Sequence, residues 1–114
     1  MAQKTPTRKK TLTEVKHFVK EYVGYLRAQG VPVECAYVYG SYARGTARAG
    51  SDIDLCVVSP QFSDPGKALS FLWMKRRDID VQRDIEPVGY HPREFKVIES
   101  PLVWDIYENG LRII

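Results

Sequence analysis

Two aspartates separated by one residue, Asp52 and Asp54, have the clearest chemical potential in this sequence. Ile53, Leu55 and Val57 alternate with them, a pattern that predicts a strand. Side chains two apart in a strand point to the same face, so the two carboxylates would repel each other. A divalent cation such as Mg²⁺, which is commonly held by one or two carboxylates and by phosphate oxygens, would offset that repulsion. A solvated strand face explains the pair equally well, so the pair alone leaves both interpretations open.

A glycine-serine step and an arginine precede the aspartates. Gly40 has no Cβ, so the backbone there can approach a ligand closely. Exposed amides and the Ser41 hydroxyl suit phosphate oxygens, and Arg44 offers a fork of donors for the same group. Gly-Ser alone is weak evidence. Gly-Ser, Arg-Gly and Asp-x-Asp in succession are a far more specific indication of a phosphate and metal site.

The elements that position these residues can be read from the pattern around them. We predict strands over 33–39 and 52–59, joined by a loop over 42–51 that contains two glycines. A third strand, rich in acids, is predicted over 78–88, because apolar and acidic residues alternate at its start.

Helices are indicated by their capping signals. A Thr11–Glu14 capping box opens a helix that ends at Gly30. Asp64-Pro65 opens a second, and Ser100-Pro101 a third. The order α-β-β-α-β-α predicts an α/β (α+β) fold, a small mixed β-sheet flanked by helices.

The charge distribution favours a globular domain without a nucleic-acid surface. The formal net charge is +3, but four cations and no acid lie in residues 1–13, and the remainder has 13 basic and 14 acidic residues. We therefore predict a disordered basic tail over 1–10, which would be solvated, and a single domain over 11–114. No apolar run approaches the ~20 residues that span a bilayer, and we expect a cytoplasmic protein.

Residues 40–45 (GSYARG) and 51–55 (SDIDL) together resemble the minimal nucleotidyltransferases of the DNA polymerase beta superfamily. The resemblance implies the nucleotidyltransferase fold and transfer of a nucleoside monophosphate, AMP from ATP, to an acceptor hydroxyl. By the same resemblance, Gly40, Ser41 and Arg44 would bind the nucleotide. Asp52 and Asp54 would hold two Mg²⁺ ions, which clamp the attacking and leaving oxygens.

The family also uses a third carboxylate on a later strand, as a general base or metal ligand. Strand parity places all four candidate acids on one face: Asp78, Asp80, Asp84 and Glu86. The run DIDV at 78–81 resembles the family's isoleucine-aspartate pattern, so Asp80 is the predicted third catalytic and metal-binding residue. The run IEP at 85–87 also resembles small members and keeps Glu86 as an alternative.

Minimal members are commonly paired with a helical partner of the HEPN type, as toxin–antitoxin systems. The resemblance therefore implies a nucleoside triphosphate and a HEPN-type protein as partners, with adenylylation of a protein or small-molecule hydroxyl. The alternative is a non-catalytic binding module that neutralises a partner by contact. Mg²⁺-dependent turnover of ATP with the partner present separates the two.

Overall fold

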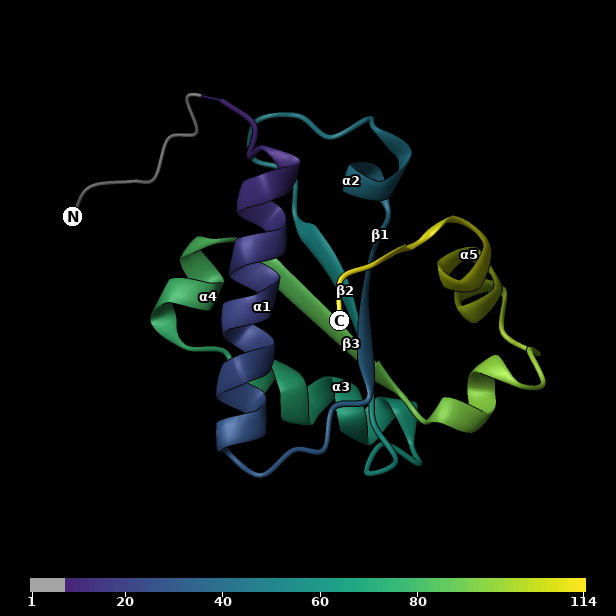
Figure 1. The fold of residues 1–114 in the computed structure, drawn as a ribbon. Coiled ribbons are helices and arrows are strands. Elements are labelled where there is room, and N and C mark those ends of the chain that lie inside the picture. The colour runs from purple at the N-terminus through teal and green to yellow at the C-terminus, as the bar shows by residue number, and fades with distance from the viewer. Residues whose placement is uncertain (1–7) are drawn as a thin grey trace.

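The structure, a computed structural model, describes residues 8–114 and contains a four-stranded mixed sheet (Figure 1). The strands are β1 (Cys35–Tyr39), β2 (Ile53–Val58), β3 (Ile85–Tyr90) and β4 (Leu111–Arg112), in the order β3-β2-β1-β4. β1 is antiparallel to β2 and β4, whereas β2 and β3 are parallel. The predicted α/β class with a small mixed sheet is confirmed.

Helices cover both faces of this sheet. Figure 1 shows α1, α3 and α4 on one side and α5 with the short helix η1 on the other, while α2 lies beyond the end of β1. Their bounds are α1 (Leu12–Ala28), α2 (Ser41–Arg44), α3 (Pro65–Met74), α4 (Asp78–Gln82), η1 (Pro92–Phe95) and α5 (Pro101–Asn109).

The predicted helix starts are present. Thr11 Oγ1 accepts from the Glu14 amide at 3.1 Å, and Glu14 Oε1 accepts from the Thr11 amide at 2.9 Å, which completes the capping box. Asp64 accepts from the Gly66 amide at 2.9 Å at the start of α3, and Ser100 accepts from the Val103 amide at the start of α5. These local bonds fix where the helices begin.

The sheet separates a large apolar cluster from a small one. The large cluster joins alternate residues of the strands, such as Val38 and Leu55, to the buried stripe of α1 and to Leu72 of α3. The small cluster lies on the opposite face, where Ile106 of α5 packs against buried residues of β2. The second face is therefore only partly covered, and its end near the start of β2 carries polar side chains.

The strand predicted over 78–88 is wrong in its first half. Asp78–Gln82 form the helix α4, and β3 begins only at Ile85. The strand was predicted because the apolar residues Ile79 and Val81 alternate with acidic ones. These two side chains are 40% and 49% exposed, so they do not form the buried face of a strand. Asp84, which separates the two elements, has a left-handed backbone with φ of 62°.

The N-terminal segment contacts the domain from Arg8 onward. Residues 1–7 of the predicted disordered tail lie outside the described residues. Arg8 pairs with Glu14 at 2.7 Å, and Lys10 pairs with Asp84 at 2.9 Å in a half-buried setting. Between residues 8 and 114 there is no helix with the length and apolar character needed to cross a membrane.

Candidate active site

One row of side chains crosses the sheet where β1 ends and β2 and β3 begin. The strand register pairs Asp54 with Tyr39 on one side and with Glu86 on the other. Directly paired residues present their side chains on the same face. Asp52, just before β2, is exposed and close enough to Glu86 to raise the pKa of that carboxyl group, which burial raises most. The structure therefore brings Asp52, Asp54 and Glu86 together at the end of the sheet where β2 and β3 begin.

The three acids act on one another electrostatically. Burial raises the pKa of Asp54 above its ordinary value, and the charge of Asp52 raises it further. Burial also raises the pKa of Glu86, as do its hydrogen bond to Asp52 and the charges of the two aspartates. Arg44 lowers the pKa of Asp54, so its guanidinium reaches the same region. A cation placed among these carboxylates would relieve their repulsion.

Gly40 lies directly against Asp54. Its backbone has φ of 72° and ψ of −142°, a conformation accessible almost only to glycine. A Cβ at this position would overlap Asp54 Oδ2 and lie 3.1 Å from Asp54 Cγ. The absence of a side chain at Gly40 is therefore what leaves room for the Asp54 carboxylate. The sequence analysis predicts that Gly40 lets the backbone approach a bound ligand, and that remains a prediction.

Ser41 opens the four-residue helix α2, whose start has no side-chain cap. The Thr46 amide donates to the Ser41 carbonyl at 2.9 Å, which closes this turn. Farther along the loop, Ser51 Oγ accepts from the Arg48 amide at 2.8 Å, and the Ser51 amide donates to the Arg48 carbonyl at 3.0 Å. These bonds order the loop immediately before Asp52.

Asp80 lies elsewhere. It is fully buried, and its two carboxylate oxygens accept from Arg77 Nε at 2.9 Å and from the Arg77 terminal nitrogen at 3.0 Å. The charge of Asp80 raises the pKa of Tyr22 on α1, and the Arg77 guanidinium stacks over Tyr25 of the same helix. Asp80 thus faces the α1 layer and is not brought to Asp52 and Asp54.

The acid that joins the two aspartates is Glu86, the alternative that the sequence left open. The prediction that Asp80 and Glu86 share one strand is wrong, because α4 and the turn at Asp84 separate them. Pro87 was a sequence signal that could have pointed to Glu86. Proline has no amide hydrogen, so within a sheet it is tolerated at an edge. Pro87 therefore indicates that the neighbouring Glu86 lies in an edge strand, as it does in β3.

The donor set fits a magnesium ion that arrives with phosphates. Within residues 8–114, no group of three or more His, Cys, Asp or Glu side chains is arranged to hold a metal ion unaided. Mg²⁺ prefers oxygen ligands and is usually bound by one or two carboxylates together with substrate phosphates, not by a closed protein cage. Asp52 and Asp54 supply such oxygens beside the backbone at Gly40.

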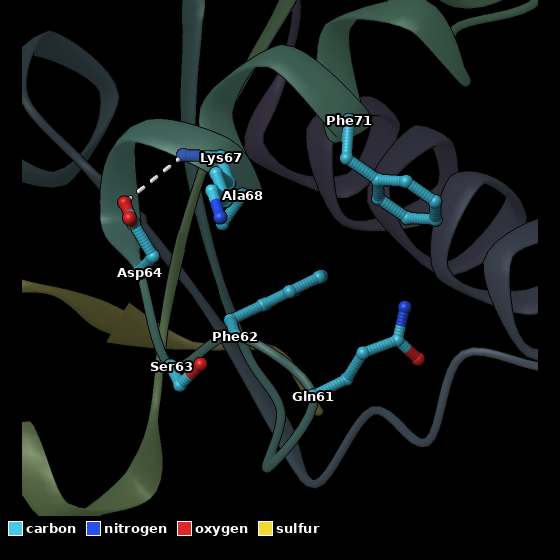
Figure 2. A pocket seen from close by; sticks show the side chains of 7 residues that line it. All are labelled: Gln61, Phe62, Ser63, Asp64, Lys67, Ala68 and Phe71. Carbon is cyan, nitrogen blue, oxygen red and sulfur yellow. Dashed lines mark hydrogen bonds between the residues drawn. The ribbon is translucent and has the colours of Figure 1, made fainter.

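A separate hollow lies at the other end of β2 (Figure 2). It is lined by Gln61, Phe62, Ser63, Asp64, Lys67, Ala68 and Phe71. The carboxylate of Asp64 is engaged there by the amides of Gly66 and Lys67, as the cap of α3. The hollow therefore belongs to the start of that helix and contributes nothing to the row of acids.

Comparison with known proteins identifies the family and the fold. Residues 12–110 match the family described as "Nucleotidyltransferase domain". No curated protein sequence matches the chain.

Three solved structures share the fold at less than 20% identity. A protein from Sulfolobus solfataricus described as a nucleotidyltransferase superposes with a TM-score of 0.62 at 18% identity, covering 93% of this chain and 88% of that one. A toxin-antitoxin crystallised with AMP-PNP gives 0.60 at 19% identity, covering 87% and 72%. A mutant of the toxin-antitoxin MntA-HpeT gives 0.56 at 18% identity, covering 83% and 71%.

Proposed function

Because the chain belongs to the nucleotidyltransferase domain family, we propose that it transfers a nucleoside monophosphate, AMP from ATP, to a hydroxyl group of an acceptor. The observation that carries the proposal is the gathering of Asp52, Asp54 and Glu86 beside Gly40 and Ser41. Acidic side chains in mutual repulsion next to a turn that begins at a glycine are suited to a metal–triphosphate complex.

Each residue has a role that its position supports. The Gly40–Ser41 turn offers amides and a hydroxyl to the triphosphate, and Arg44 neutralises phosphate charge. Asp52 and Asp54 would hold Mg²⁺ together with the triphosphate, with two ions proposed, and Glu86 lies beside them. Bound Mg²⁺ supplies charge neutralisation and orientation for the displacement at the α-phosphate.

Glu86, in place of Asp80, is proposed as the third acid. Its place opposite Asp54 in the strand register suits a group that accepts the proton of the acceptor hydroxyl as the new phosphate ester bond forms. The α-phosphate then separates from pyrophosphate, which leaves. Asp80 is assigned to the stability of α4, because both its oxygens are bound by Arg77.

The acceptor is proposed to be a protein of the helical HEPN type. Support comes from the fold, which is shared with two structures described as toxin-antitoxins, one of them containing AMP-PNP.

The test is transfer of labelled AMP to a protein that co-purifies with this chain. ATP labelled at the α-phosphate should label that protein in the presence of Mg²⁺, whereas ATP labelled at the γ-phosphate should not. Asp54→Asn should abolish labelling, and Glu108→Gln, which neutralises an exposed carboxylate in the last turn of α5, serves as the matched control. Labelling that survives in Asp54→Asn, or that follows the γ-phosphate, would refute the proposal.

The same experiment addresses the non-catalytic alternative. If this chain acts only by contact, Asp54→Asn will neutralise the partner as well as the unmodified chain does, without label transfer by either. If it acts by transfer, neutralisation and labelling will be lost together.

A further inference from the structure

The strand that carries Glu86 is held along its outer side by Trp73 of α3 and by Arg76, which follows the end of that helix. β3 is at the edge of the sheet, and among residues 8–114 its only neighbouring strand is β2. Trp73 Nε1 donates to the Pro87 carbonyl at 3.0 Å, and an Arg76 terminal nitrogen donates to the Ile85 carbonyl at 3.3 Å. The two bonds therefore fall on the residues immediately before and after Glu86.

Trp73 and Arg76 also hold each other. The Arg76 guanidinium carbon lies 3.8 Å from the centre of the Trp73 ring, and Arg76 Nε donates to the Trp73 carbonyl at 3.3 Å. A guanidinium stacked on an indole is attracted by the ring's negative face. The two side chains consequently form one unit, which lies along the carbonyls on either side of Glu86.

An edge strand without such support would exchange its outward hydrogen bonds with water and open more often than the inner strands. Along a strand, the backbone N–H and C=O groups of successive residues point alternately to one side and to the other. In β3 the groups that point inward bond β2, and the carbonyls of Ile85 and Pro87, which point outward, accept from the Trp73–Arg76 unit. Motion of β3 would carry the Glu86 carboxylate away from Asp54, its partner in register.

We propose that Trp73 and Arg76 are positioning residues that fix β3 on both sides of Glu86 and thereby aim its carboxylate at the site of nucleotidyl transfer. The proposal rests on the proposed function, in which Glu86 is the third acid. It differs from mere protection of a sheet edge, because it requires the loss of either bond to affect the transfer step more than nucleotide binding.

Three variants test it. Trp73→Phe removes the indole N–H but keeps an aromatic ring under Arg76. Arg76→Lys keeps the positive charge but lacks the planar fork that reaches two carbonyls at once. Lys75→Ala is the control: it removes the adjacent cation, whose ammonium lies 5.6 Å from the centre of the Phe71 ring.

Two readouts are needed. The first is kcat and KM for MgATP in AMP transfer. For Trp73→Phe we expect kcat to fall about fivefold, the rate equivalent of one neutral hydrogen bond, and for Arg76→Lys at least about fivefold, since its bond carries a charge, with KM within about twofold in both. The second is amide hydrogen exchange of β3 in the protein without nucleotide, which should accelerate about fivefold in both variants. Lys75→Ala should change neither.

The outcomes separate the inference from the function on which it rests. Unchanged kcat and unchanged exchange in both variants, with only a lower melting temperature, would overturn the positioning role. If the unmodified chain transfers no AMP, the proposed function fails. The positioning role then falls with it, and the exchange data decide the structural half: faster exchange confined to β3 shows that Trp73 and Arg76 hold the strand, and unchanged exchange overturns that as well.

Discussion

Replacing Gly40 by alanine should damage the candidate site far more than the same replacement at Gly45, although both glycines flank α2 and both have a positive φ. At Gly40 the added methyl group would overlap Asp54 Oδ2, whereas at Gly45 it would meet nothing within 4 Å. Both substitutions thus place an alanine at a positive φ, but only the one at Gly40 creates a steric overlap.

The backbone contributions can be estimated separately. Gly45 is in the left-handed helical region, with φ of 74° and ψ of 19°, where an L-residue costs about 1–2 kcal/mol. Gly40, with φ of 72° and ψ of −142°, is in a region used almost only by glycine, at a cost of about 1–3 kcal/mol. At about 4 °C per kcal/mol for a domain of this size, both variants should melt several degrees lower.

Nucleotide binding should distinguish the two. In Gly40→Ala the Asp54 carboxylate must move away from its position beside the turn, and we expect affinity for a magnesium–nucleotide complex to fall at least tenfold, equivalent to about 1.4 kcal/mol. In Gly45→Ala it should stay within about threefold. Calorimetry with Mg²⁺ and an ATP analogue carrying a methylene between the α- and β-phosphates measures this without turnover, and thermal denaturation gives the stability of each variant.

Equal affinity of the two variants for the analogue would refute the reasoning, provided that both are folded at the temperature of measurement. It would mean that the contact between Gly40 and Asp54 has no part in binding. An equal loss of affinity in both variants would also refute the reasoning. It would show that the altered backbone at the ends of α2, and not displacement of the Asp54 carboxylate, weakens binding.

Further expectations concern the acids, the buried tyrosines and the serine. Asp80→Asn should lower stability by roughly 1.5–3 kcal/mol, as expected for hydrogen bonds to a charged group, and retain transfer. Glu86→Gln should retain stability and lose transfer. Transfer assays and thermal melts of both variants test this: loss of transfer in Asp80→Asn with full transfer in Glu86→Gln would show that Asp80 is the third acid. Tyr22→Phe should cost about 1 kcal/mol in urea unfolding, since its hydroxyl donates to a buried carbonyl at 2.8 Å. Tyr42→Phe should cost nothing or stabilise, because that buried hydroxyl finds no hydrogen-bond partner among residues 8–114, and a loss above 1 kcal/mol would count against this. Ser41→Ala should weaken analogue binding by about 0.5–1.5 kcal/mol at an unchanged melting temperature, and EDTA should abolish binding. A sharp drop in melting temperature would make Ser41 a structural turn residue.

Short-range signals predicted the helix starts because the responsible contacts are local. Thr11 and Glu14 are three residues apart and bond each other's backbone, and Asp64 bonds the second residue after it. No knowledge of the rest of the fold is needed for such bonds. By contrast, β4 is only two residues long and exists through its pairing with β1, so no pattern within Leu111–Arg112 could have indicated it.

The third acid could not be chosen from sequence for a related reason. Alternation along 78–88 suggested one continuous strand, and strand parity then made four acids equivalent. The helix α4 breaks that parity: Asp80 turns toward α1, while Glu86 falls opposite Asp54 only through the parallel register of β2 and β3. Register between strands separated by about thirty residues is a property of the assembled sheet, which single-sequence patterns do not contain.

The ion pair between Lys10 and Asp84 sets a practical boundary for recombinant versions of this protein. A chain begun at Thr11 would keep the whole family match over residues 12–110 and the capping box of α1. It would nevertheless lack the Lys10 ammonium, which lies 2.9 Å from Asp84, a left-handed residue two positions before Glu86. Truncation at a family boundary would thus alter the turn that leads into the site, so a first residue at or before Arg8 is the safer choice for crystallisation and binding work.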